Sequence, residues 1–305
     1  MLRPKRNEEE PKKMKNSKKP LISVIMPVYN AGDFLVEAIE SIRWQSYKNW
    51  EMICIDDGST DKSLKILKDF AKKDKRINVI HSSENQGLAV ALNKGLEKAK
   101  GEFIARMDAD DISLPERFAK QLEFLLKNPH VIAVGSQSEL IDEKGDFLGY
   151  KKFPCDSQKL YKMMLEMVSI QHPTLMTYAK IMKKYKYENH QTAEDVSMFF
   201  KLLQNGDFGN TKEVLFQYRI RKNSNSFKDP KKTFYLTLKS RIKAVRKWGY
   251  KPNLKGILVN LAQLFLITVL PKEAILNLYE FLRFRKLGAN FSSAKTLRPA
   301  LIKER

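Results

Sequence analysis

Three carboxylates stand within four residues of one another, directly after a short apolar run. Residues Phe103–Met107 are mostly apolar, which is the pattern of a buried strand, and Asp108, Asp110 and Asp111 follow them. Side chains two positions apart on an extended backbone point the same way, so Asp108 and Asp110 should aim at one spot past the strand's C-terminal end. Two convergent carboxylates repel each other unless a positive charge lies between them. A divalent cation that carries phosphates would meet that need.

The same acids also fit an ordinary acidic loop that leads into a helix. Ser113-Leu-Pro-Glu116 has the composition of a helix start, which predicts a helix over residues 115–127. A second acidic strand end favours a ligand site, because Asp56 and Asp57 follow the apolar run 50–55. Ligands of open α/β sheets bind at the carboxyl ends of the strands, where two neighbouring acidic ends would converge.

The elements that must position these acids alternate between strands and helices. Apolar runs predict strands at 21–26, 50–55, 77–80 and 103–107. Periodicity of 3.6 residues predicts helices between them at 33–44, around 64–70 and at 86–100. Asp33 is the expected N-cap of the first helix. This rhythm indicates right-handed βαβ units and a parallel sheet. Farther on, the pattern predicts a strand at 131–137, a hairpin near Glu143–Gly145, a helix at 156–170, a helix that opens at Thr192–Asp195 and a strand at 214–220.

Several common classes of protein are excluded by what the chain lacks. The loop after the first strand has one glycine instead of G-x-G-x-x-G, and no P-loop sequence G-x-x-x-x-G-K-[ST] occurs. Cys54 and Cys155 are far apart and fit neither a disulfide framework nor a metal–thiolate site, so we expect a reducing cytoplasm. The first residues contain no apolar segment of the kind found in a secretory signal.

The net charge of +21 is concentrated at the two ends of the chain. Residues 1–19 hold 8 basic against 3 acidic residues and are predicted to be a disordered basic tail, and residues 228–305 hold 18 against 4. The intervening residues 20–227 therefore carry only +2. A nucleic-acid enzyme would place positive charge around its active cleft, so we expect no nucleic acid as partner. Basic flanks on a nearly neutral core suit an anionic membrane surface.

The basic region 228–305 has the pattern of amphipathic helices. Residues 233–248 predict a basic helix, 257–270 form an apolar run of 14 residues, and 274–284 form another amphipathic stretch. The apolar run is short of the ~20 residues needed to span a bilayer, so we expect helices that lie in the plane of the membrane surface. The alternative is a helical hairpin packed on the rest of the chain or in a dimer.

The order of motifs resembles a known family. The signature of family-2 inverting glycosyltransferases with a GT-A fold is similar, in order and spacing, to five segments of this chain: Val24–Asn30, Ile55–Asp61, Asn85–Leu88, Gly101–Ile104 and Asp108–Asp111. His172-Pro, Glu194-Asp195 and Tyr218-Arg219 fall where the acceptor-side motifs of that family fall. The likeness covers residues 20–227 and implies an α/β GT-A fold, a mostly parallel Rossmann-like sheet flanked by helices, with the basic helical region as an appendage.

The resemblance implies roles for the donor side of the site. Pro27 and Tyr29 would lie near the nucleobase, and Asp57 would accept a hydrogen bond from a uracil N–H. Asp108 would face the ribose and the metal, and Asp110 would ligate Mn²⁺ or Mg²⁺. The donor implied is a UDP-hexose or a UDP-N-acetylhexosamine.

On the acceptor side, the resemblance implies that Asp195 is the general base, with His172 and Glu194 beside the acceptor. Arg219 and Arg221 lie where cations would clamp the diphosphate, although solvated surface charge is an equal alternative. The acceptor would be a hydroxyl of a glycan or of a lipid-linked sugar, the product a β-glycoside, and the location the inner face of the cell membrane. Arg221 departs from the family, in which a histidine is common at this position.

Two other functions fit parts of the sequence. A nucleotidyltransferase has a similar sheet, but its phosphate loop, rich in glycine, arginine and lysine, is missing after the first strand. A non-catalytic adaptor that binds membranes or nucleic acid would explain the charge of +21, but it leaves the two acidic strand ends without a purpose.

Overall fold

The computed structural model describes residues 19–189, 193–221, 229–271 and 274–275. Most of the predicted tail, 1–18, and most of the stretch 274–284 lie outside this part. The elements, in chain order, are β1 (Ile22–Val28), α1 (Leu35–Arg43), β2 (Trp50–Asp57), α2 (Ser63–Lys73), β3 (Ile77–Ser82), α3 (Leu88–Lys98), β4 (Phe103–Arg106), β5 (Ile112–Ser113), α4 (Arg117–Lys127), β6 (Val131–Ile141), β7 (Phe147–Lys151), α5 (Ser157–Met163), the 3₁₀ turn η1 (His172–Thr174), β8 (Met176–Tyr178), α6 (Ala179–Met182), α7 (Glu194–Leu202), β9 (Asp207–Arg219), α8 (Pro230–Lys247) and α9 (Leu254–Val269).

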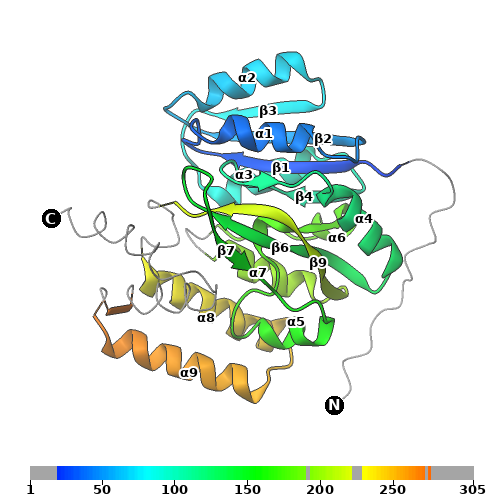
Figure 1. Ribbon diagram of the computed structural model, residues 1–305. Helices are drawn as coiled ribbons and strands as arrows, with labels where there is room; N and C mark the ends of the chain where they lie inside the picture. Colours follow the sequence, from blue (N-terminus) through cyan, green and yellow to red (C-terminus); the bar gives the residue numbers. More distant parts are fainter. Residues whose placement is uncertain (1–18, 190–192, 222–228, 272–273, 276–305) are drawn as a thin grey trace.

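The strands form one mixed sheet (Figure 1). Its order is β3-β2-β1-β4-β8-β6-β9-β5, with β7 paired to β6. The strands β1 to β4 are parallel, as the βαβ rhythm predicts, whereas β8 runs antiparallel to both β4 and β6. The chain moves outward from β1 to β3 and then returns to the other side of β1 for β4. This reversal is the kind of switch point at which open α/β sheets bind ligands.

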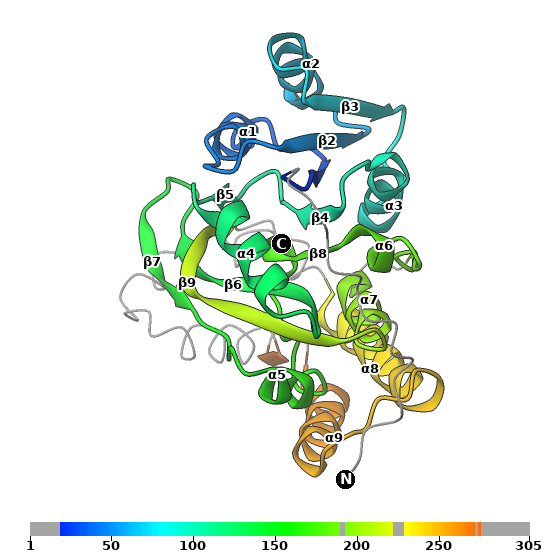
Figure 2. The ribbon, with the colours of Figure 1, turned by 90° about the vertical axis from the view of Figure 1, so that its right-hand side faces the viewer.

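Alternation along the strands divides the core into two layers. On β1, Val24 and Met26 face the layer that contains α1, α2 and α4, whereas Ile25 faces the layer that contains α3 and α7. Figure 2 shows α1 and α3 on opposite faces of the parallel strands. Helix α3 approaches its face closely, because a Cβ on Gly95 would lie 2.5 Å from Ile25 Cγ2. The packed sheet therefore holds the ends of β1, β2 and β4 rigidly side by side.

The predicted helix caps are wrong. Helix α1 follows Phe34, which makes no side-chain cap, and Asp33 forms an ion pair with Lys62 at 2.8 Å. Ser113 lies in β5, and α4 begins four residues later. The first turn of α4 is capped from a distant element, because Gln45 Oε1 accepts a hydrogen bond from the backbone N–H of Phe118 at 3.0 Å. The cap is therefore tertiary, and local sequence could not show it.

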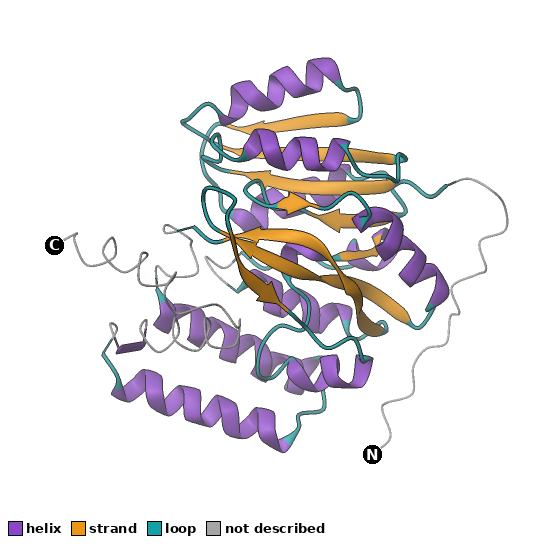
Figure 3. Cartoon of the chain, viewed as in Figure 1, coloured by secondary structure: helices purple, strands orange, loops and turns teal. Residues whose placement is uncertain are grey.

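The basic C-terminal region is helical over the residues described. Helices α8 and α9 form a layer below the sheet, with α9 outermost (Figures 1 and 3). Helix α8 packs against α7, where the rings of Phe200 and Tyr250 lie 5.0 Å apart. Among the residues that the structure describes, no helix is both long and apolar enough to span a lipid bilayer.

The predicted helix at 156–170 is shorter than expected, since α5 ends at Met163.

Candidate active site

The loops that follow β1 and β2 hold each other in place. Asn30 Oδ1 accepts a hydrogen bond from the N–H of Thr60 at 2.9 Å, and the N–H of Gly32 donates to Asp61 Oδ2 at 2.9 Å. Asn30 has a φ of 48°, a left-handed conformation that asparagine tolerates better than most residues. Pro27 lies near the end of β1, and Tyr29, which is 50% exposed, follows it at this edge. The predicted nucleobase residues are therefore set beside the end of β2.

Asp57 joins the end of β2 to the start of α3. Its carboxylate oxygens accept hydrogen bonds from the backbone N–H groups of Gln86 at 3.1 Å and Gly87 at 2.8 Å. The chain then turns at Gly58, whose φ is 73° and where a Cβ would lie 2.5 Å from the carbonyl carbon of Glu84. Only glycine fits this turn. Asp57 is thus buried and held in one orientation, and each of its oxygens keeps a lone pair for a further donor.

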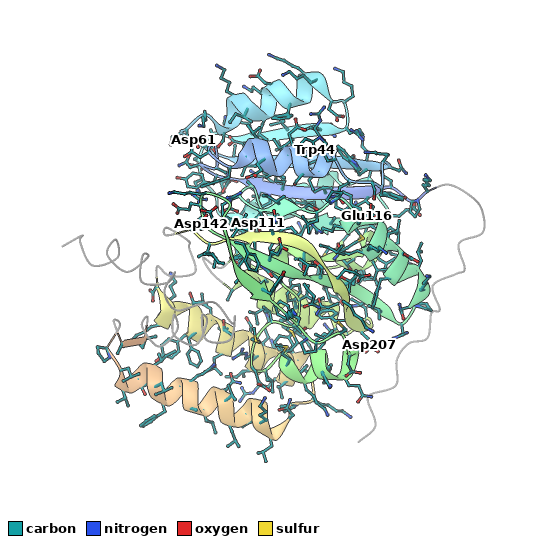
Figure 4. All side chains as sticks on the ribbon, in the orientation of Figure 1. Trp44, Asp61, Asp111, Glu116, Asp142 and Asp207 are labelled. Atoms are coloured by element: carbon teal, nitrogen blue, oxygen red, sulfur yellow. The ribbon has the colours of Figure 1, made fainter. Side chains whose placement is uncertain are left out.

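Past the end of β4, the three aspartates of the acidic stretch converge. Oxygens of Asp108, Asp110 and Asp111 all lie within 4.8 Å of one another. Asp108 forms an ion pair with Arg106, and Asp110 Oδ2 lies 3.0 Å from Arg221 Nη1. The convergence of Asp108 and Asp110 agrees with the two-residue alternation of the sequence. Figure 4 shows Asp111 at the same end of the sheet as Asp61 and Asp142, away from Glu116 and Asp207.

Asp111 is part of this cluster, although its sequence position suggested a loop or cap residue. It is 1% exposed, and its Oδ1 accepts a hydrogen bond from the backbone N–H of Arg219 at 2.8 Å. Its Oδ2 is buried and has no hydrogen-bond partner among the described residues. Burial and the charges of Asp110 and Asp108 raise the pKa of Asp111 well above its ordinary value. A buried carboxylate oxygen without a donor, beside two further carboxylates, fits the oxygen ligands that a hard divalent cation prefers.

Arg106, the last residue of β4, pairs with Asp108 of the aspartate cluster, and its charge also acts on the predicted base. Its side chain is buried, and its Nε has no hydrogen-bond partner among the described residues. The charge of this guanidinium opposes the rise of the pKa in Asp108, Asp111, Glu194 and Asp195. Both groups of acids are therefore under the influence of one buried cation. The sequence contained a signal for Arg106, a charged residue inside an apolar strand.

The acceptor-side acids open helix α7, as the sequence predicts. They follow Ala193, which has a φ of 63°, a left-handed conformation that is costly for a residue with a Cβ. Such strain persists where the surrounding structure imposes it, often at functional sites. Asp195 Oδ1 accepts a hydrogen bond from the N–H of Val196 at 2.8 Å. Burial raises the pKa of Asp195, and burial together with the charge of Asp195 raises the pKa of Glu194 to about 7.

Replacing Glu194 should change how stability depends on pH. An acid whose pKa is higher in the folded chain stabilises the fold while it is protonated, and that contribution is lost as the pH rises toward the folded value. With the pKa of Glu194 raised to about 7, the free energy of unfolding of the wild type should fall relative to that of Glu194→Gln as pH rises from about 5 to about 8. A difference on the order of 1–3 kcal/mol is expected from urea denaturation. An offset that is constant with pH would contradict this prediction.

His172 is enclosed by protein groups. Its Nε2 lies 2.8 Å from the hydroxyl of Tyr187, and its ring packs edge-on against Phe199. Burial and the nearby charge of Arg106 lower the pKa of His172 well below its ordinary value, so the imidazole is neutral. Tyr187, which the sequence did not single out, is itself buried and hydrogen-bonded through its backbone to Asn93.

The two predicted phosphate cations have different surroundings. The guanidinium of Arg219 donates to the carbonyl oxygens of Asp110 at 2.8 Å and Asp142 at 3.0 Å, and to Glu37 at 2.5 Å. It is buried and joins α1, the aspartate loop and the β6–β7 hairpin. Arg221 is more accessible, with 29% of its side chain exposed, and it forms an ion pair with Asp110.

Comparison with known proteins agrees with this geometry. The model of the family described as "Glycosyl transferase family 2" matches residues 23–191. The chain is 38% identical over 215 residues to the putative glycosyltransferase EpsE of Bacillus subtilis, covering 68% of this chain and 76% of EpsE. It is 35% identical over 223 residues to the putative teichuronic acid biosynthesis glycosyltransferase TuaG of the same organism, covering 72% of this chain and 87% of TuaG.

Solved structures share the fold at lower sequence identity. Residues 1–349 of S. aureus TarS in complex with UDP superpose with a TM-score of 0.59 at 20% identity, covering 74% of this chain and 65% of that one. The mannosyltransferase PcManGT of Pyrobaculum calidifontis, in complex with GDP-Man and Mn²⁺, gives 0.57 at 16% identity, covering 88% and 83%. The sheet is that of GT-A glycosyltransferases, and neither a nucleotidyltransferase nor a non-catalytic adaptor fits these matches. The chain belongs to glycosyl transferase family 2 and is a glycosyltransferase.

Proposed function

We propose that this glycosyltransferase moves a sugar, with inversion, from a UDP-sugar to a hydroxyl of a glycan or lipid-linked acceptor and forms a β-glycosidic bond. The observation that carries the proposal is the arrangement of two groups of carboxylates around Arg106. One group, at the end of β4, suits a divalent cation that would bind the diphosphate, and the other, at the start of α7, suits a base. The TarS complex with UDP supports this choice of donor by analogy of fold.

The donor would bind along the ends of β1, β2 and β4. Tyr29 and Pro27 would flank the nucleobase, Asp57 would accept its N–H, and Asp108 would face the ribose. Asp110, Asp108 and the orphaned oxygen of Asp111 would hold Mn²⁺ or Mg²⁺. Such a cation, when bound, neutralises the diphosphate and stabilises the charge that develops on the leaving group.

The acceptor hydroxyl would meet Asp195. The carboxylate of Asp195 takes the proton of the acceptor hydroxyl while the hydroxyl oxygen attacks C1 of the sugar. The bond from C1 to the diphosphate oxygen breaks in the same step. This single displacement inverts the anomeric centre, so an α-linked donor gives a β-glycoside. The N–H of Val196 orients one oxygen of the base. Glu194 and the neutral His172, held by Tyr187, would shape the acceptor side.

Arg221 is well placed to bind the diphosphate, whereas Arg219 serves also as a structural link between loops. Because Arg221 pairs with Asp110, a divalent cation competes with it for the same carboxylate. Arg221→Gln should therefore bind Mn²⁺ more tightly without nucleotide, and should bind UDP more weakly in the presence of Mn²⁺. Isothermal titration measures both affinities. Lys127→Gln, which removes an exposed cation from α4, is the control for charge alone. If Arg221→Gln lowered the affinity for both Mn²⁺ and UDP, or for neither, the result would argue against this role.

Titration with UDP, with and without Mn²⁺, tests the donor proposal. We expect UDP to bind and the affinity to rise when Mn²⁺ is present. Binding of UDP that is indifferent to the metal would remove the metal from the proposal, and absence of binding would remove the UDP-sugar donor. A screen of UDP-sugars for slow hydrolysis would then identify the sugar.

We also propose that the enzyme works at the inner face of the cell membrane as a peripheral protein. Residues 228–305 carry 18 basic and 4 acidic residues, and an anionic surface attracts such a segment. A lipid-linked acceptor would be found at the same surface.

A further inference from the structure

Helix α9 turns its two amide side chains, Asn260 and Gln263, toward Arg241 of α8. Asn260 is buried, and its Nδ2 donates to the carbonyl oxygen of Leu165 at 2.7 Å. Its Oδ1 accepts a hydrogen bond from the buried Arg241 of α8 at 2.8 Å. On the same side, a Cβ on Gly256 would lie 2.6 Å from Leu165 Cβ, so the helix fits closely against the residues after α5. This polar contact fixes the rotation of α9 about its axis.

The opposite side of α9 is apolar and exposed. Seven large side chains are between 37% and 72% exposed: Leu254, Ile257, Leu258, Leu261, Phe265, Leu266 and Val269. All except Leu266 recur at spacings of three and four residues and form one stripe along the helix. We call this stripe the outer face of α9. A helix that faces water normally shows the reverse arrangement, and contiguous apolar surface of this kind marks a binding site.

The geometry limits what can cover the outer face. A helix of 16 residues is about 24 Å long and too short to cross a bilayer, so an apolar partner must lie along its side. The two helices of this layer also carry exposed basic side chains, with Lys255 in α9 and Arg246 and Lys247 at the end of α8. A second copy of this chain would bring the same positive charges together. A lipid surface with anionic headgroups accepts both the apolar side chains and the cations.

The surface is joined to the predicted base through packed elements. Helix α8, whose Arg241 donates a hydrogen bond to Asn260 of α9, packs against α7, whose first turn carries Asp195. Glu188 lies 3.0 Å from Lys201 of α7 and 2.6 Å from Lys243 of α8, and so ties the two helices together. A membrane contact at α9 would therefore hold the acceptor side of the site at a set orientation to the surface.

We propose that the outer face of α9 lies in the interfacial layer of an anionic lipid membrane, with the helix axis in the plane of the surface. The proposal rests on the proposed function, because it names the surface through which this glycosyltransferase meets a membrane. According to this proposal, membrane attachment depends on the six apolar side chains of the outer face and not on the positive charge of the region alone. The cations add affinity for anionic headgroups.

Flotation of the full-length protein with vesicles tests the proposal. Vesicles of phosphatidylcholine alone are compared with vesicles that also contain phosphatidylglycerol. The test variant is Leu261→Glu/Phe265→Glu in α9. The matched control is Val36→Glu/Leu126→Glu, which places the same charges at two exposed apolar positions on α1 and α4. Circular dichroism verifies that each variant is folded.

We expect the wild type to float with the anionic vesicles and the α9 variant to lose roughly tenfold or more in partition, as deletion of two buried apolar side chains implies. The control should float as the wild type does. Equal flotation of wild type and α9 variant would overturn the proposal, as would a lipid-free dimer that the α9 variant converts to a monomer. UDP binding is measured separately from flotation. A negative flotation result therefore leaves the donor proposal intact, and a negative UDP titration leaves the flotation result interpretable.

Discussion

Asp195→Asn should abolish sugar transfer while leaving UDP affinity unchanged. The amide keeps the shape of the side chain and still accepts the hydrogen bond from Val196, but it cannot take a proton from the acceptor hydroxyl. General-base catalysis is typically worth ~10²–10⁴-fold, and kcat should fall by about this factor. Transfer is measured with the best UDP-sugar from the hydrolysis screen, and UDP affinity by titration calorimetry.

Glu194→Gln is the matched comparison for this prediction. It changes the adjacent carboxylate in the same turn of α7, and we expect a smaller loss of kcat because Glu194 is assigned to the acceptor side. If Asp195→Asn turned over normally while Glu194→Gln did not, the two roles would have to be exchanged. Normal turnover in both variants would refute a base at the start of α7.

Asp110→Ala should weaken both metal and donor binding. The substitution removes one of the three carboxylates in the cluster and leaves Arg221 without its ion pair. Loss of residues that merely support metal ligands costs 10–100-fold in metal affinity, so removal of a ligand should cost Mn²⁺ affinity by roughly 100-fold or more. The affinity for UDP in Mn²⁺ should fall to the level measured without metal, and transfer should be lost.

The control for this prediction is Glu116→Ala. Glu116 is a carboxylate at the opposite end of the sheet, so its loss changes the net charge equally without touching the cluster (Figure 4). Calorimetric titration with Mn²⁺ and then with UDP follows both effects. If Asp110→Ala kept the metal-dependent gain in UDP affinity, Asp108 and Asp111 would have to hold the cation by themselves.

Most of the parallel half of the fold could be predicted from the sequence. The strands at the start of the chain are apolar and bounded by turn residues, and the two-residue alternation placed Asp108 and Asp110 on one side of the backbone. These features depend on neighbours in the chain, so local patterns contain them. The return of β4 to the side of β1 was not predicted, because the right-handedness of βαβ units fixes only which face of the sheet each connecting helix covers.

The partners of these residues depended on distant parts of the chain. Arg221 comes to Asp110 across 111 positions, and Gln45 caps α4 across 73 positions. The burial of Asp111 and the effect of Arg106 on two groups of acids arise from elements that meet only in the folded chain. No window of sequence contains these contacts, because they form only when β4, β9 and α7 are packed together.

Helix α9 shows the division between sequence and tertiary structure most clearly. The sequence by itself determined an apolar helix too short to span a membrane and interrupted by Asn260 and Gln263. That pattern favoured apolar residues that meet a membrane surface, and it left open their packing against the rest of the chain or in a dimer. The tertiary structure decided which side of the helix faces inward, because Arg241 and the carbonyl oxygen of Leu165 supply hydrogen-bond partners for Asn260 in the interior. A buried amide must be paired, so these two contacts turn the leucines outward.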